Sequence, residues 1–499
     1  MSTGAAIMVI EILGAKMLAP FVGTSHFVWT AQIAVTLVSL AAGYYGGGWL
    51  VDRSQRLGRL YTAILLAAAY LCFSVLWVRP VAYWCLDFRL AIGSLLASTF
   101  LFFIPLALLA MTGPFFVRVL TQSVSGVGGS VGRLTALSTL GSFFGTLLIG
   151  YVLIPYLANS LTMFLTAAFL GLVVAGYFFA WGRRERGPML ILVALAGLCA
   201  GPAGVWADRT SHPGELTELF RGNSNFGLLQ VVETEDGSHR YYLNDFLAQN
   251  IYDPREKKSA ALFTYMLRGL SRAYAGKVER ALCIGMGVGL VPMELAREGV
   301  AVDVVEINPA IVPVAQKFFN FDPALVRLTI GDGRQFINRE TNRYDAILLD
   351  AFLGDSSPSH LLTVEAFTSM RKLLRPGGTL VINTFVDFRP GNDFFGASLE
   401  KTLKAVFKGV RVHAAARNDL VNVFFVASDH ADLQALGQPD FSQVHPSVRE
   451  RAENTFATIV EADPGHGLVL TDDYNPLEFR DARNRETTRR NLAEHMRSP

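Results

Sequence analysis

The sequence predicts a multi-pass α-helical membrane bundle followed by a Rossmann-like α/β domain, with a small β-hairpin region between them. Two observations predict this fold class. Charged residues are sparse before residue 205, in a chain that is 51% hydrophobic and only 17% charged. Between Val278 and Glu306 a strand, a glycine-rich turn, a helix and a strand ending in an acid form the pattern of a nucleotide-binding βαβ unit.

The domain organisation follows from these two halves. We expect a transmembrane helical domain over 1–206, a β-hairpin region over 215–255, a nucleotide-binding catalytic domain over 256–440, and a closing segment with a basic tail over 441–499. The hairpin is predicted by alternating apolar runs on either side of the turn 235–238. A second hairpin, over 410–413 and 421–427, is expected to close the sheet.

Apolar stretches in the N-terminal half predict the membrane helices. They cover 4–21, 27–50, 60–78, 90–117, 134–157, 161–181 and 188–205. The first six are long enough to cross about 30 Å of hydrocarbon as helices. Gly201-Pro202 interrupts the seventh, which we expect to be a re-entrant or interfacial helix.

Arginines in the connections predict the orientation of the bundle. The basic segments 52–59 and 183–186, with Arg118 and Arg133, favour the cytoplasmic side and place the N-terminus inside. No basic segment opens the chain, so no cleavable signal peptide is expected. If the seventh stretch crossed, the soluble half would emerge outside. We favour a bacterial-type inner membrane protein with a cytoplasmic catalytic domain, because its nucleotide ligand is made there.

Glu11 and Lys16 lie inside the first apolar stretch. Ionisable groups in membrane helices are candidates for function, such as a transport path or a contact to a lipid head group. The alternatives are a mutual ion pair, or Lys16 reaching the interface.

Composition limits the partners. A net charge of +2 gives no reason to expect nucleic acid, and four scattered cysteines do not have the spacing of a metal site. We expect contact with membrane lipid and a small nucleotide substrate, and glycine-rich spans permit a homodimer.

Three acids follow three predicted strands of the soluble half. The loop 285–289 carries Gly285, Gly287 and Gly289, which let the backbone approach a ligand, and Glu306 is suited to hold ribose hydroxyls. Asp332, next to Gly333, is suited to hold an adenine amino group, and Asp350 leaves the end of the strand 344–349. Ligands of open α/β sheets bind at the carboxyl ends of the strands, so we expect these acids to share one site.

Together, Glu306, the turn 331–333 and the strand 344–350 resemble spermidine synthases and their membrane-fused relatives. The resemblance implies a methyltransferase-type fold without a prosthetic group, with S-adenosylmethionine or its decarboxylated form as substrate. It also implies that Asp350 takes the proton from an attacking amine and that Gln249 contacts the nucleotide, although a surface role for Gln249 is equally open. Asp355 is a candidate for holding the amino end of the transferred chain.

The chain departs from this family at three places. Val288 stands where the family has an acid that anchors the amino group, 263–265 replace a Tyr-His-Glu segment, and the second catalytic acid has moved to Asp355. Further possible site-lining side chains are Tyr242, Tyr265, His360, Asp472 and Asp473. His360 is equally well explained as a loop histidine, and the two aspartates as a helix N-cap.

The leading hypothesis is an enzyme that breaks the sulfonium bond on the aminopropyl or aminocarboxypropyl side and releases methylthioadenosine. It includes a version that acts as an S-adenosylmethionine lyase without an amine acceptor, slightly favoured by Val288. The alternatives are an ordinary polyamine aminopropyltransferase and, from another class, a nucleotide-sensing or transporting membrane protein. A methyltransferase is disfavoured by the strand that ends in Asp350.

Overall fold

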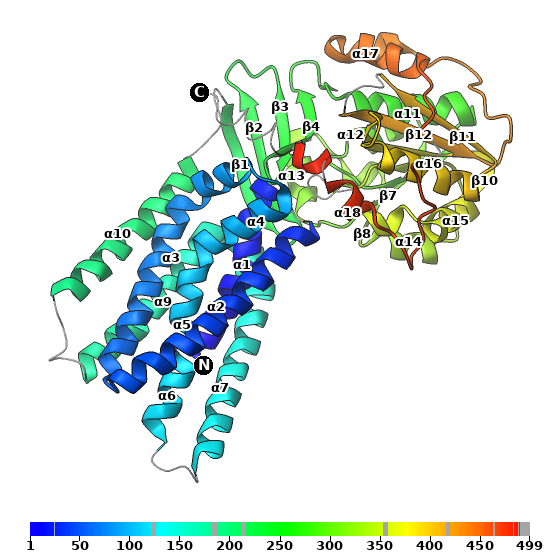
Figure 1. Cartoon of the computed structure of the whole chain (residues 1–499). Helices are drawn as coiled ribbons and strands as arrows, with labels where there is room; N and C mark the ends of the chain where they lie inside the picture. The colour runs from blue at the N-terminus through cyan, green and yellow to red at the C-terminus, as the bar shows by residue number, and fades with distance from the viewer. Residues whose placement is uncertain are drawn as a thin grey trace. The chain divides into compact units, whose positions relative to one another are not determined.

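The computed structural model describes residues 1–23, 25–121, 126–181, 188–210, 216–352, 358–415, 420–462, 465–482, 484–487 and 489. Two compact units make up the chain (Figure 1). The helical unit comprises Met1–Gly214, Gly222–Gly227 and Arg489–Pro499, and the α/β unit comprises Glu215–Arg221 and Leu228–Thr488.

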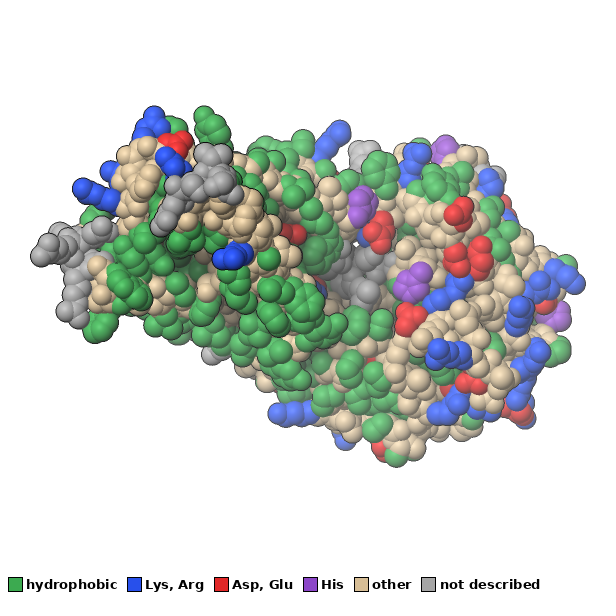
Figure 2. Space-filling view, turned by 90° about the horizontal axis from the view of Figure 1, so that it is seen from below, with side chains coloured by type: hydrophobic (Ala, Val, Ile, Leu, Met, Phe, Trp, Pro, Cys, Tyr) green, Lys and Arg blue, Asp and Glu red, His purple; other side chains and the backbone are tan. Residues whose placement is uncertain are grey.

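Long apolar helices form the helical unit. They are α1 (Ser2–Val22), α2 (His26–Arg53), α3 (Leu57–Cys85), α4 (Leu90–Ser98), α5 (Ile104–Ala110), α6 (Thr112–Leu120), α7 (Val127–Leu148), α8 (Ile154–Tyr156), α9 (Asn159–Ala180) and α10 (Pro188–Thr210). Two π-helical turns, η1 (Thr99–Phe103) and η3 (Ile149–Leu153), join α4 to α5 and α7 to α8. Among the described residues, seven helical segments are long and apolar enough to cross a membrane. Figure 2 shows hydrophobic side chains over much of the visible face of these helices.

The expected interruption of the seventh stretch is wrong. Helix α10 continues through Gly201 and Pro202, and 20 of its residues meet the length and hydropathy of a span. The glycines of this helix serve close packing, because a side chain at Gly201 would meet the Phe164 ring and one at Gly204 would meet Val75. Neighbouring helices make a proline tolerable inside such a helix.

The β-hairpin region is larger than expected. The predicted hairpin is confirmed as the antiparallel pair β2 (Gly227–Thr234) and β3 (Arg240–Asn244). The strands β1 (Leu216–Ser224), β4 (Leu247–Asp253) and β5 (Lys258–Ser259) extend it to a five-stranded sheet in sequence order.

A seven-stranded sheet of order β11-β12-β10-β9-β6-β7-β8 forms the centre of the α/β unit. Its strands are β6 (Arg280–Ile284), β7 (Ala301–Glu306), β8 (Arg327–Ile330), β9 (Tyr344–Leu349), β10 (Leu374–Asp387), β11 (Gly409–Ala414) and β12 (Leu420–Ser428). The strands β10, β9, β6, β7 and β8 pair in parallel, while β12 is antiparallel to its two neighbours, as the expected closing hairpin requires.

Helices enclose this sheet and bury both of its faces. They are α11 (Leu262–Ala275), α12 (Leu290–Arg297), α13 (Ile311–Phe319), α14 (Gly333–Arg339), α15 (Val364–Leu373), α16 (Phe394–Val406), α17 (Pro446–Ala457) and α18 (Leu477–Arg480). Alternation along β6 sends Ala281 and Cys283 into one core and Leu282 and Ile284 into the other. Strand order reverses at β6, between β9 and β7, which is the switch point at which α/β sheets bind ligands.

Candidate active site

The glycine loop after β6 is shaped by backbone conformations that favour glycine. Gly285 has φ +93°, and a side chain there would collide with the backbone of Asp350. Gly287 has φ +53°, and a Cβ atom there would lie 2.7 Å from Oδ1 of Asn250. Since other residues rarely adopt such angles, glycine lets the loop lie against both of these groups.

Glu306 ends β7 directly beside this loop. Its carboxylate accepts hydrogen bonds from the backbone N–H of Met286, at 3.0 Å, and of Asn308, at 2.7 Å. Burial raises the pKa of Glu306, while these bonds favour its charged form. Each carboxylate oxygen has further lone pairs, so the fixed group can still accept ligand hydroxyls.

Tyr242 and Asn250 lie opposite each other on β3 and β4. Burial raises the pKa of Tyr242, and the negative charge of Glu306 raises it further, so the ring lies near the acid at the end of β7. Asn250 is buried and lines a small cavity together with Gly285 and Asp350. The sequence indicated its neighbour Gln249, whose contact to the nucleotide stays a prediction. A bulge in β4, between the pairs Leu243–Ala248 and Tyr242–Asn250, shifts the ladder at this point.

Asp350 follows β9 and lies against the glycine loop. Its backbone N–H donates to the carbonyl of Ile284, and its carboxylate accepts a 2.8 Å hydrogen bond from Nδ2 of Asn383 on β10. Burial raises the pKa of Asp350 to about 6, although the Asn383 bond acts in the opposite direction. A carboxylate with this pKa is mostly ionised at neutral pH and is well matched to accept a proton. Asn383 was not recognised from the sequence.

Asp332 and His360 lie together at the start of α14. Asp332 caps this helix by accepting from the backbone N–H of Gln335 at 2.8 Å, and its second oxygen lies 3.2 Å from Nε2 of His360. Gly333 begins α14 in close contact with Ile284, where a Cβ atom would lie 2.7 Å from a methyl carbon. The structure thus joins two of the assigned side chains, and a contact of Asp332 to adenine stays a prediction.

The segment that contains Asp472 folds back on the first turn of α14. Arg334 donates to Asp472 at 2.6 Å and to the carbonyl oxygen of His360 at 3.0 Å. Asp472 also accepts from the hydroxyl of Thr363 at 2.7 Å. Pro476 is the N-cap residue of α18, so Asp472 and Asp473 do not cap that helix. Asp473 is exposed.

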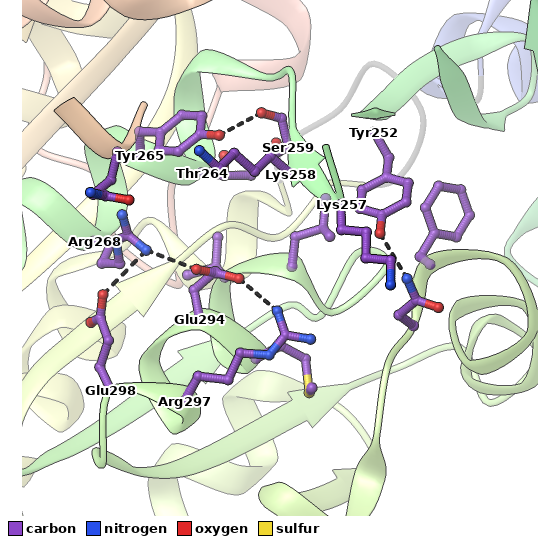
Figure 3. A pocket seen from close by; sticks show the side chains of 16 residues that line it. Tyr252, Lys257, Lys258, Ser259, Thr264, Tyr265, Arg268, Glu294, Arg297 and Glu298 are labelled. Atoms are coloured by element: carbon purple, nitrogen blue, oxygen red, sulfur yellow. Dashed lines mark hydrogen bonds and ion pairs between the residues drawn. The ribbon is translucent and has the colours of Figure 1, made fainter. Parts of the chain in front are cut away.

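Tyr265 lines a different pocket, with a volume of about 160 Å³ (Figure 3). Its hydroxyl donates to the carbonyl of Ser259 at 2.6 Å. In the same pocket Arg268 pairs with Glu294 and Glu298, so much of the charge is neutralised internally. The cavity at Asp350 is lined from the same helix, α11, by Phe263 and Leu267.

Two further positions complete the sequence-based assignments. Val288 is fully buried in the hydrophobic core. Asp355 lies outside the described residues. Within the described part of the chain, no group of three or more His, Cys, Asp or Glu side chains is arranged to hold a metal ion.

Comparisons with known proteins find polyamine aminopropyltransferases and also methyltransferases, among them putrescine N-methyltransferase 2 of Nicotiana tabacum, 32% identical over 126 residues, 24% of this chain and 36% of that protein. A spermine/spermidine synthase domain matches residues 262–415, within the α/β unit. The polyamine aminopropyltransferase of Vibrio vulnificus is 40% identical over 235 residues, which are 46% of this chain and 78% of that protein. The probable polyamine aminopropyl transferase of Bifidobacterium longum is 28% identical over 283 residues, 53% of this chain and 62% of that protein. The solved spermidine synthase from Thermotoga maritima has 19% identity and a TM-score of 0.39, covering 48% of this chain and 84% of that one.

Proposed function

The chain belongs to the polyamine aminopropyltransferase family and is an enzyme of that type, and we propose that it moves the aminopropyl chain of decarboxylated S-adenosylmethionine to an amine. The observation that carries the proposal is the Asp350 carboxylate, held by Asn383 against the glycine loop with a pKa of about 6. The other product of the reaction is methylthioadenosine.

The reaction is a displacement at the methylene carbon beside the sulfonium. The amine nitrogen forms the new C–N bond, the C–S bond breaks, and its electron pair stays on sulfur as a neutral thioether. Asp350 accepts the proton that the amine loses. Positioning supplies much of the acceleration in such a step, and a well-placed base contributes about a hundred- to ten-thousand-fold.

The nucleotide is assigned to the groups around the switch point. Glu306 accepts the ribose hydroxyls, and its two backbone hydrogen bonds keep the carboxylate in place. Tyr242 and Asn250 belong to the five-stranded sheet. They lie near the end of the seven-stranded sheet that carries Glu306. Asp332 accepts from the adenine amino group, and His360 supports its orientation.

A second candidate reaction acts on S-adenosylmethionine itself. Its own carboxylate would attack the carbon beside sulfur, closing a homoserine lactone as the C–S bond breaks and methylthioadenosine leaves. The observation that favours it is Val288, because a valine buried in the core offers no anchor for the ammonium group of the transferred chain. Asp355 is the acid we assign to that ammonium group in the first reaction.

The two reactions are separated by product analysis of the full-length protein in detergent. It is incubated with S-adenosylmethionine or its decarboxylated form, each with and without a polyamine, and products are identified by mass spectrometry. Aminopropyl transfer requires the decarboxylated substrate and the amine together. Methylthioadenosine and homoserine lactone from S-adenosylmethionine alone would establish the lyase instead, and no turnover in any arm would contradict both.

The helical unit is proposed to anchor the enzyme in a membrane. Large apolar side chains stay exposed on several of its helices, for example Trp49, Leu172 and Phe179. In water such a surface would drive aggregation, whereas lipid covers it at no cost.

A further inference from the structure

Fully buried polar groups without a partner occur in the interior of the helical unit. Gln32 on α2 is 0% exposed, and neither its amide oxygen nor its nitrogen forms a hydrogen bond with a described residue. The hydroxyls of Ser94 and Ser98 on α4 are likewise fully buried and without a partner in that part of the chain. Leaving such groups unsatisfied costs free energy, most of all where no water is present, so their presence calls for an explanation.

These groups belong to one cluster with Glu11. The Glu11 carboxyl is bonded to the hydroxyl of Thr36, which also donates to the backbone carbonyl of Gln32 at 2.9 Å. One turn along α1 from Glu11, a Cβ atom at Gly14 would lie 2.8 Å from the Gln32 amide nitrogen and 2.9 Å from the Phe102 ring. We call Glu11, Gln32, Thr36, Ser94 and Ser98 the Glu11 cluster.

The two serines lie on the helix next to these residues. Ser94 and Ser98 are four residues apart on α4, so they share one face of that helix. This helix packs against both α1 and α2. It is followed directly by the π-turn η1, an irregularity that is frequent at functional sites.

The cluster has one formal negative charge and no cation to balance it. No ion pair to Glu11 is formed by the residues that the structure describes, and Lys16 donates to the backbone carbonyl of Asn225 at 3.0 Å. The mutual ion pair considered from the sequence is not among the ion pairs that the described residues form. Glu11 is partly buried, and a carboxylate at such a position in a membrane helix is stabilised by protonation, by a cation or by water.

A cavity of about 810 Å³ ends one turn of α1 short of Glu11 and is lined by no member of the cluster. It lies between α1, α2, α6 and α7, and α1 lines it with Thr3 and Ile7. Glu11 is the next residue at the same four-residue spacing, one turn further along α1. Many of its other lining groups carry hydroxyls, namely Thr112, Thr121, Thr135, Ser138, Thr139 and Ser142, and its charged groups are Asp52 and Arg118. This volume is that of a site for a small organic molecule and far exceeds a bare ion.

We propose that the helical unit binds a small organic ammonium ion at the Glu11 cluster and that the ion enters through this cavity. The carboxylate balances its charge, and the amide oxygen of Gln32 and the serine hydroxyls accept its N–H groups. This satisfies the buried oxygen atoms of Gln32, Ser94 and Ser98, and the hydroxyl-rich cavity holds the rest of the molecule. The proposal does not depend on the reaction assigned to the α/β unit.

The test is equilibrium dialysis of radiolabelled putrescine against the full-length protein in detergent. Wild-type protein is compared with Glu11→Gln, which keeps the size of the side chain but removes its charge. The expected result is a loss of at least tenfold in affinity at one site per chain. Asp350→Asn and Asp87→Asn, which remove a carboxylate elsewhere, are expected to retain that site. Equal binding by Glu11→Gln and wild type, loss of all binding in Asp350→Asn, or binding of ²²Na⁺ but not of putrescine would each overturn the proposal.

A labelling experiment keeps the proposal testable if Glu11→Gln does not fold. Cys199 is the exposed native cysteine, and Cys72, Cys85 and Cys283 are buried, so Cys199→Ser supplies the background. Thr139→Cys then reports on the cavity through its rate of reaction with a maleimide. Putrescine is expected to slow this reaction at least threefold, whereas an unchanged rate at saturating putrescine would contradict entry through the cavity.

Discussion

Asp350 and Asn383 are the residues whose contact decides the acid–base chemistry. Burial disfavours the charge of the Asp350 carboxylate and raises its pKa to about 6, while the amide of Asn383 stabilises the charged form. A general base must be deprotonated to act, so activity is expected to fall as the pH decreases through about 6. The pH at which activity falls is the acidic limb of the pH–activity profile. Its position therefore reports on the environment of the Asp350 carboxylate.

Asn383→Ala is expected to move the acidic limb to higher pH. Removing the amide takes away the hydrogen bond that lowers the pKa of Asp350, so protonation occurs earlier as the pH falls. The measurement is kcat/KM from pH 5 to 8. As a control, Asn342→Ala removes an asparagine side chain that precedes β9, at the opposite end of this strand from Asp350. This substitution should leave the acidic limb in place. A limb that stays unchanged in Asn383→Ala would show that another group is the base.

Glu306→Gln is expected to weaken nucleotide binding by about 10- to 100-fold. Hydrogen bonds to a charged group are worth about 1.5–3 kcal/mol, and the amide offers one acceptor oxygen where the carboxylate offers two. Isothermal titration with methylthioadenosine measures the change. Glu298→Gln, in the pocket of Figure 3, serves as the matched control with wild-type affinity. Equal affinities of Glu306→Gln and wild type would remove Glu306 from the ribose site.

The positions of individual residues were predictable where strand ends define them. Glu306 and Asp350 were assigned because the parallel strands end there, and both lie at the glycine loop. Asn383 lies within a continuous apolar strand and belongs to no motif, so its contact arises only when β10 pairs beside β9. Asn250 was missed because Gln249 was assigned from the family resemblance, whereas Asn250 is recognised only from its pairing with Tyr242 and its place in the cavity at Asp350.

The periodicity of apolar residues predicted most helices and strands of the α/β unit. It did not predict that α10 continues through Gly201 and Pro202. Gly201 and Pro202 are typical breakers in an isolated helix. In the structure, packing against Phe164 and Val75 requires small residues along α10, so tertiary contacts override the local preference.

The hairpin β11–β12 includes a histidine whose burial links stability to pH. His413 is bonded to the carbonyl of Phe456 and to the hydroxyl of Tyr274, each at 2.8 Å, and burial lowers its pKa. The unfolded state therefore binds a proton more readily than the folded state. The stabilising contribution is complete above the unfolded pKa of about 6.5 and is lost as the pH falls through the lower folded value.

His413→Gln is expected to reduce the loss of stability between pH 7.5 and pH 5.5. The wild-type contribution is at most about 1.4 kcal/mol for each pH unit, which corresponds to one proton. Thermal unfolding of the full-length protein in detergent gives the two transition temperatures. His430→Gln, which changes an exposed histidine, should retain the wild-type difference. If His413→Gln also retains it, the histidine does not control the pH response.

At the scale of the whole chain, the continuous α10 changes the expected topology. Five spans follow the connection after α2, namely Leu57–Cys85, Leu90–Leu120, Val127–Tyr156, Asn159–Ala180 and Met189–Asp208. If all five candidate segments cross, Ser54 and the residues after α10 lie on opposite sides of the membrane. The cytoplasmic position expected for the soluble half rested on an interrupted seventh stretch; α10 is continuous, so that reason no longer holds, and the side of the membrane stays a prediction.

Cysteine accessibility in intact cells tests the number of crossings. Ser54→Cys and Gly437→Cys, each in a Cys199→Ser background, are treated with a membrane-impermeant maleimide. We expect one of the two to be labelled from outside and the other only after lysis. Labelling of both from the same side would mean that one of the five segments does not cross.

The most direct test of the central claim is the rate of methylthioadenosine release by Asp350→Asn, with nucleotide affinity measured on the same samples. Decarboxylated S-adenosylmethionine and a polyamine are supplied at pH 7.5. We expect the rate to fall by about a hundred- to ten-thousand-fold while the Kd for methylthioadenosine changes little, because the substitution removes the base and leaves the nucleotide contacts intact. An Asp350→Asn enzyme that turns over at the wild-type rate would contradict the assignment of Asp350 as the group that accepts the amine proton.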